Sequence, residues 1–180
     1  RPHFKGLPKP HIALIIGGST KATVFTASMA RELAGRAIEA TKAIDGSLLV
    51  TTSRRTGQEN EAIIAEMLSS SGVPYHLHDW NAKAENPYFG YLALADILIV
   101  TGDSVSMCCE ASAAPGGVYI YAPDGIANPR HQLLHQALYD GDYARPLLPN
   151  TEIVPFKHPS LQPARMVAQR CLELLSAPVS

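Results

Sequence analysis

The chain has 180 residues and a formal net charge of −1, with 15 Lys and Arg against 16 Asp and Glu. This length suffices for one domain with a sizeable core, or at most two small ones. The balanced charge, with no basic cluster larger than Arg54-Arg55, excludes the electrostatic footprint of a nucleic-acid-binding protein.

The elements expected along the chain alternate between strands and helices. Residues 1–10 contain three prolines and are expected to form a linker, and residues 11–180 a single domain. Strands are expected at 11–16, 46–52, 73–78, 97–100 and 117–121, with a short last strand at 152–155. Helices are expected at 22–43, from a capping box at 56–59 to about 71, from 86 onward, from 105 onward, at 129–139 and at 163–175. The alternation predicts an α/β fold, a Rossmann-like three-layer domain with a mostly parallel sheet in the order 3-2-1-4-5.

The stretch 96–114 combines a buried strand with a turn and a helix start. The apolar run 97–100 suits a strand buried on both faces, and the turn residues that follow include Gly102 and Asp103. Ser104 can cap a helix that begins at Val105. Unpaired N–H groups and the positive end of the helix dipole attract anions at such a place. Glu110, on the same helix, either binds a ligand hydroxyl or reaches solvent at the edge of the sheet.

Three further segments each follow a strand of the parallel sheet and are therefore expected at the same rim. Ligands of such sheets bind there, beyond the carboxyl ends of the strands where the strand order reverses. The Gly-rich loop after the first strand is either a ligand loop or an ordinary strand-to-helix turn. The arginines after the second strand suit a phosphate or carboxylate, or are simply solvated. The residues at the end of the third strand offer an aromatic surface for a base, although Trp is more often part of a core. The candidate ligand-binding residues are Gly17, Gly18, Ser19, Thr20, Lys21, Ser53, Arg54, Arg55, Asp79, Trp80, Gly102, Asp103, Ser104, Val105, Ser106, Met107 and Glu110.

Other chemistries receive weaker support from the sequence. His131 and His135 lie one helical turn apart but without an H-E-x-x-H pattern, so they are expected at the surface and no metal site is predicted. Gly102-Asp103-Ser104 suggests a GDS-type serine hydrolase, yet no Asp has a His three positions later and G-x-S-x-G is incomplete. The three cysteines form neither a disulfide framework nor a zinc spacing, which favours reduced thiols in a cytoplasmic protein.

Three segments together resemble a known family. VTTSRRTG (50–57), NPYFGYLALADILIVTGDSVSMCCEA (86–111) and HQLLHQALYDGDYARPL (131–147) are similar to the mitochondrial fission ELM-type family, whose bacterial members are often labelled predicted nucleoside-diphosphate-sugar epimerases. The resemblance covers nearly the whole chain. Because the family's proteins are longer, it implies that this chain is the C-terminal half of a longer protein, with the N-terminal domain as its partner. Contact with a membrane is then expected only through parts outside this chain.

A more distant likeness is to the C-terminal domain of GT-B glycosyltransferases. It implies that Gly17, Gly18 and Ser19 hold the diphosphate of a nucleotide-sugar, most simply a UDP-sugar, with no other cofactor. By the same likeness residues 102 and 104–107 form the anion site at a helix terminus, Glu110 binds the ribose hydroxyls, and Asp79 and Trp80 lie beside the base. Asp103 departs from the pattern, because an acid stands where a phosphate approaches; we expect it to turn away or to pair with Lys21 or Arg54. The resemblance implies a nucleotide-sugar-binding domain of a glycosyltransferase or epimerase, and leaves open a non-enzymatic protein-interaction module.

Overall fold

The computed structural model describes residues 6–162, so the helix expected at 163–175 lies outside the described residues. Its six strands form one sheet in the order β3-β2-β1-β4-β5-β6, and every pairing is parallel. The strands are β1 (His11–Ile15), β2 (Ser47–Thr51), β3 (Tyr75–His78), β4 (Ile97–Thr101), β5 (Gly117–Tyr121) and β6 (Arg145–Pro146). The helices are α1 (Ala27–Ala43), α2 (Gln58–Ser70), α3 (Tyr88–Leu94), α4 (Val105–Ala113) and α5 (Pro129–Asp140). The predicted α/β class and the order of the first five strands are confirmed.

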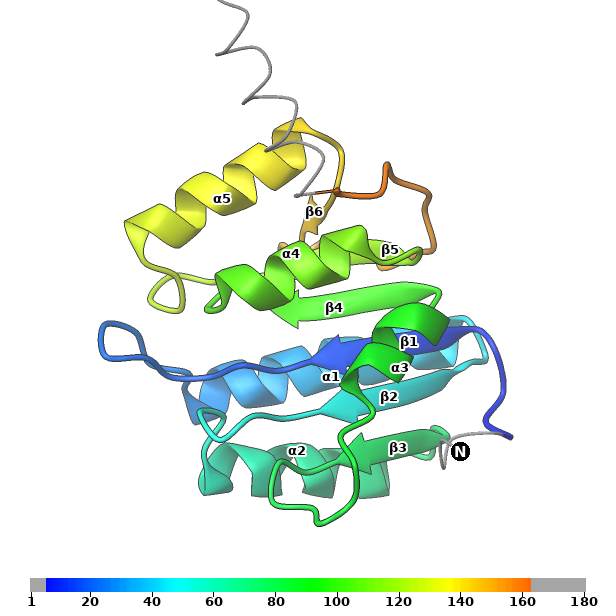
Figure 1. Ribbon diagram of the computed structural model, residues 1–180. Coiled ribbons are helices and arrows are strands. Elements are labelled where there is room, and N and C mark those ends of the chain that lie inside the picture. The colour runs from blue at the N-terminus through cyan, green and yellow to red at the C-terminus, as the bar shows by residue number, and fades with distance from the viewer. Residues whose placement is uncertain (1–5, 163–180) are drawn as a thin grey trace, which may run out of the picture.

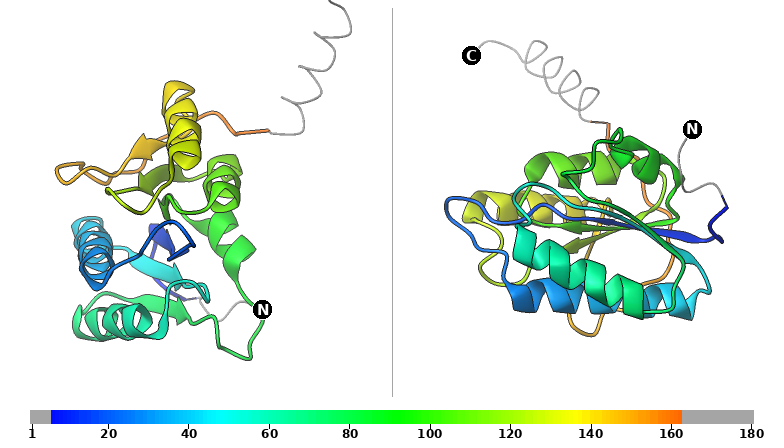
Figure 2. Two further views of the ribbon diagram at one scale, coloured as in Figure 1. Left: turned by 90° about the vertical axis from the view of Figure 1, so that its left-hand side faces the viewer. Right: turned by 90° about the horizontal axis from the view of Figure 1, so that it is seen from below.

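The helices cover both faces of the sheet, which makes three layers (Figures 1 and 2). Alternate residues of β1 point to opposite faces: Ile12 and Leu14 join the cluster beneath α1 and α2, whereas Ala13 and Ile15 join the one beneath α3, α4 and α5. All residues of β1, β2, β4 and β5 are buried, as continuous apolar runs require of central parallel strands. Within residues 6–162, no helix combines the length and apolar character needed to span a bilayer.

The last strand differs from the expectation. Residues 152–155 do not pair as a strand; β6 forms earlier, and Leu147 N donates to Ile120 O at 2.9 Å. Around Val154 the backbone instead bonds to a side chain, because Val154 O accepts from the Tyr119 hydroxyl at 2.9 Å. A hydroxyl supplied from the neighbouring strand therefore replaces the backbone ladder there.

Two helix starts also differ from the expectation, for the same physical reason. Helix α1 begins at Ala27 rather than near 22, because the Thr20 hydroxyl accepts from Thr23 N at 3.1 Å and the Ser19 hydroxyl from Phe25 N at 3.0 Å. The capping box predicted for α2 is wrong. Gly57 is the N-cap, without a side-chain bond, and the Thr56 hydroxyl donates to Gly17 O at 2.7 Å instead. Polar side chains that could have capped helices are used to hold the loops after the strands.

Candidate functional site

The loops after β1 and β4 lie side by side at the point where the strand order reverses (Figure 1). We call residues 17–21 the β1 loop and residues 102–104 the β4 loop. Gly17 N donates to the Thr101 hydroxyl at 2.8 Å, and Gly18 N donates to Asp103 Oδ2 at 3.0 Å. The two segments that the sequence placed at one rim are therefore in direct contact.

Asp103 joins these loops from inside the protein. Its side chain is fully buried, and Oδ2 lies 2.8 Å from Nη1 of Arg55. Asp103 was expected to turn away or to pair with Lys21 or Arg54; the pairing is wrong, since its charged partner is Arg55, the next arginine along the chain. Its other oxygen, Oδ1, is buried without a hydrogen-bond partner among the described residues. The carboxylate thus occupies donors that an anion would otherwise use, and it is held by only one of its oxygens.

The loop after β2, residues 53–56 (the β2 loop), is bonded to the β1 loop from the other side. The Ser53 hydroxyl donates to Gly17 O at 2.5 Å, and Ser19 N donates to Arg55 O at 2.9 Å. An ideal Cβ on Gly18 would lie 2.0 Å from Arg55 O, so only glycine fits between the two loops. Ser53 and Gly18 therefore have a structural role in this arrangement, whatever else they bind.

Polar groups facing solvent remain at this rim. Lys21 and Arg54 are exposed. At the start of α4, Ser104 caps Met107 N at 3.4 Å, as predicted. Helix geometry leaves the N–H groups of Val105 and Ser106 without partners inside the helix, and both residues are exposed. The two cations and the first turn of α4 can bind an anion from the solvent side.

The remaining predicted residues lie directly after β3 and in the second turn of α4. Asp79 and Trp80 follow β3 at the edge of the sheet, where Trp80 is 41% exposed and its backbone N–H donates to the Thr52 hydroxyl at 3.3 Å. Glu110 is exposed in the second turn of α4 and accepts a hydrogen bond from the Tyr88 hydroxyl. Its assignment to ribose hydroxyls stays a prediction.

His135 was expected at the surface, and this expectation is wrong. It is 4% exposed and lies beneath the β4 loop, with Nε2 3.8 Å from the Sγ of Cys108 and the ring so close that a Cβ on Gly102 would lie 2.6 Å from Cε1. Burial lowers the pKa of His135. The signal available in the sequence was Leu138, three residues on and also buried, which places His135 on the inner face of α5.

We expect acidification to destabilise the protein partly through His135. The unfolded chain binds a proton near the ordinary pKa of about 6.5, whereas the buried ring does not, so lowering the pH favours unfolding. This destabilisation by His135 is absent well above a pH of about 6.5 and grows as the pH falls below it, by up to about 1.4 kcal/mol per pH unit. Urea denaturation at pH 7 and pH 5.5 should show a smaller loss for His135→Gln than for the unchanged protein. Equal losses would contradict this role.

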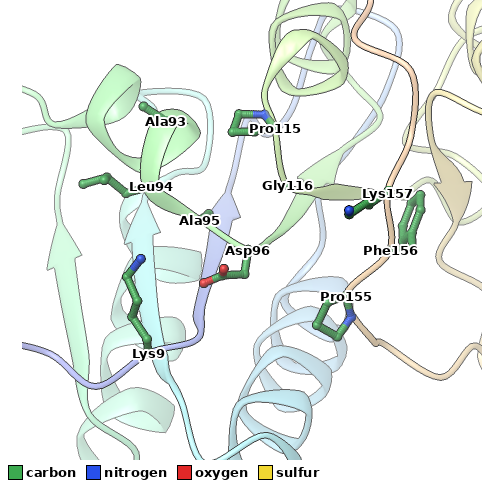
Figure 3. Close-up of a pocket in the computed structure, with 10 residues that line it drawn as sticks. All are labelled: Lys9, Ala93, Leu94, Ala95, Asp96, Pro115, Gly116, Pro155, Phe156 and Lys157. Carbon is green, nitrogen blue, oxygen red and sulfur yellow. The ribbon is translucent and has the colours of Figure 1, made fainter.

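Two described pockets lie at the ends of the strands, away from the β1 and β4 loops, and a third, of about 390 Å³, lies between α1 and residues 149–154. The larger, about 560 Å³, is at the amino ends of β4 and β5, and Figure 3 shows Lys9 and Lys157 on opposite sides of Asp96 there. Ligands of open α/β sheets bind at the other edge, so we do not assign the candidate site to it. The smaller, about 220 Å³, lies beside Thr52 and Asp79 at the carboxyl ends of β2 and β3. It contains Glu61, a buried acid not singled out from the sequence.

Comparison with known proteins adds the family context. The family model described as Mitochondrial fission ELM1 matches residues 1–175. The chain is 32% identical over 121 residues to the mitochondrial fission protein ELM1 of Arabidopsis thaliana, which covers 67% of this chain and 27% of the plant protein. It is 31% identical over 146 residues to the uncharacterized protein RP120 of Rickettsia prowazekii (strain Madrid E), which covers 80% of this chain and 39% of that protein. The matched segments therefore cover well under half the length of these relatives.

Proposed function

The chain belongs to the mitochondrial fission ELM1 family, and from that premise and the geometry of its strand-end loops we propose that it is the nucleotide-diphosphate-sugar-binding domain of a GT-B-like glycosyltransferase or epimerase. One observation carries the proposal. The β1, β2 and β4 loops meet at the reversal of the strand order; α4 begins directly after the β4 loop, and the β1 and β2 loops each carry an exposed cation. This is where open α/β sheets bind nucleotides.

Each part of the rim has a role in this proposal. The diphosphate lies over the first turn of α4, where Val105 and Ser106 are exposed and their N–H groups have no partner inside the helix, and Lys21 and Arg54 neutralise its charge. Asp103 does not repel it strongly, because Arg55 compensates the buried carboxylate at 2.8 Å. The same groups would stabilise a leaving diphosphate without a metal ion. A catalytic base and the acceptor site are expected from another domain of the longer protein.

A second candidate function is a non-enzymatic protein-interaction module. It is favoured by Asp103, which uses the Gly18 N–H and Arg55 as an internal anion and so leaves less of the site for a phosphate. The plant relative's name refers to mitochondrial fission, which suits a recruiting role as well as an enzyme. The serine-hydrolase alternative receives no support, since no hydrogen bond joins Ser104 to a histidine in the part of the chain that the structure describes.

The proposal predicts stabilisation by nucleotide-sugars. In a thermal-shift panel of nucleoside diphosphates and their sugars, at least one should raise the melting temperature, since a ligand at 100 times its Kd adds about 2.7 kcal/mol. Arg54→Ala and Glu110→Ala should each reduce the shift. Lys42→Ala, which removes an exposed cation at the far end of α1, should not. A folded protein that responds to no member of the panel would overturn the proposal in favour of the interaction module.

A further inference from the structure

The smaller pocket lies between the first half of α2 and the carboxyl ends of β2 and β3. We call it the Glu61 pocket; its volume is about 220 Å³, and it is lined by Thr52, Gln58, Glu61, Ala62, Ala65, Leu77, Asp79 and Asn81. Strand β2 is the neighbour of β1 in the sheet, so the pocket opens on the same edge as the candidate anion site. The pocket is smaller than the 300 Å³ or more typical of a site for a whole ligand, and so suits only part of one.

Glu61 is the buried acid of this pocket. Its residue exposure is 9%, and its carboxylate accepts a hydrogen bond from the Thr52 hydroxyl, which in turn accepts from the backbone N–H of Trp80 at 3.3 Å. Burial raises the pKa of Glu61, the hydrogen bond from Thr52 opposes the rise, and the nearby charge of Asp79 adds to it. Keeping a carboxylate in this place is costly, because an apolar residue would fill the space beside Ala62 and Ala65 without that penalty.

The side chains that line the Glu61 pocket determine which ligand groups it can bind. It offers two carboxylates, two carboxamides and one hydroxyl, and among these described residues there is no Lys or Arg. A phosphate would meet two negative charges without a compensating cation and is excluded. An ionised carboxylate accepts hydrogen bonds and donates none, so the two carboxylates suit a ligand with several hydrogen-bond donors. Leu77, Ala62 and Ala65 provide an apolar wall for the C–H groups of such a ligand.

We propose that the Glu61 pocket binds vicinal hydroxyls of a ribose or a sugar, with Glu61 and Asp79 as the acceptors. The identity of the ligand rests on the proposed function, in which the diphosphate of the same molecule lies at α4. The pocket as a binding site does not rest on the proposed function, because its hydrogen-bond acceptors and apolar wall would recognise a free glycoside by the same contacts. Glu61 thereby becomes a hydroxyl-binding residue in addition to Glu110.

Trp80 provides a direct readout, since it is the single tryptophan of the chain and its backbone N–H donates to the Thr52 hydroxyl, which itself donates to Glu61. Its fluorescence should change saturably on titration with methyl β-D-ribofuranoside or methyl β-D-glucopyranoside, and the more effective of the two identifies the source of the hydroxyls. UDP-glucose, UDP and inorganic pyrophosphate are titrated in parallel. We expect Glu61→Gln and Asp79→Asn to weaken binding of the effective glycoside at least tenfold. Glu66→Gln, the same change at an exposed position of α2, should leave it within twofold.

The outcomes separate the two proposals. A glycoside response that depends on Glu61, with no binding of pyrophosphate or UDP, supports the pocket and contradicts the proposed function. Binding of UDP-glucose that is equally tight in Glu61→Gln, Asp79→Asn and Glu66→Gln supports the proposed function and overturns the pocket. The pocket is also overturned if neither glycoside nor UDP-glucose changes the emission of Trp80. Asp79 is exposed, so Asp79→Asn remains a folded test if Glu61→Gln loses stability.

Discussion

Gly18→Ala should lower the free energy of unfolding by about 4 kcal/mol or more, which would leave little folded protein at 37 °C. Two costs combine at this position. Its φ of +142° lies in a region that residues with a Cβ rarely adopt, and that Cβ would lie 2.0 Å from Arg55 O and 2.4 Å from Thr56 N. These are backbone atoms, fixed by the bonds between the β1 and β2 loops, so they cannot move aside as a flexible side chain would.

Gly125→Ala is the matched control, because it separates the two costs. Gly125 also has a positive φ, +87°, on a loop of the same rim, but nothing lies within 4 Å of its ideal Cβ. Only the backbone strain remains there, about 1 kcal/mol. Urea or thermal denaturation followed by circular dichroism would measure both variants. Similar losses for Gly18→Ala and Gly125→Ala would mean that the β1 and β2 loops are not held together as described.

The sheet could be predicted from the sequence because its signals are local and repeated. Continuous apolar runs such as 97–100, each ended by turn residues, define central parallel strands, and the rules of strand connection fix their order. The start of α4 was also predictable, since Ser104 caps it through contacts within four residues. The short β6 was missed because two residues carry no periodic pattern, and the position of 152–155 depends on the hydroxyl of Tyr119, which is remote in the sequence.

The location of the candidate site could be predicted from the sequence, but the contacts within the site could not. That the β1 and β4 loops meet follows from the topology alone. Which arginine pairs with Asp103 depends on the turn of the β2 loop, in which Arg54 is exposed and Arg55 reaches inward. The sequence shows two adjacent arginines and cannot distinguish them. The burial of Glu61 likewise depends on how α2 packs over the ends of β2 and β3.

Asp103→Asn should make the protein less stable and at the same time a better binder of anions. Asparagine keeps the size of the side chain and an oxygen that accepts from Gly18 N, but loses the ion pair with Arg55 at 2.8 Å. Because Arg55 is 35% exposed, water can solvate it, so we expect a loss of about 2 kcal/mol rather than the larger cost of an uncompensated buried charge.

The gain in binding follows from the same change. With the carboxylate neutralised, Arg55 becomes available to a ligand and one negative charge beside the β1 loop is removed. Inorganic pyrophosphate should then bind at least tenfold more tightly, which corresponds to about 1.4 kcal/mol. Isothermal titration calorimetry would measure the affinity at a temperature where both proteins are folded. Asp124→Asn makes the same charge change at an exposed position of the same rim and should leave stability and affinity nearly unchanged. If Asp103→Asn bound pyrophosphate no better than Asp124→Asn, the three loops would be a structural junction, and the interaction module would become the better account of this domain.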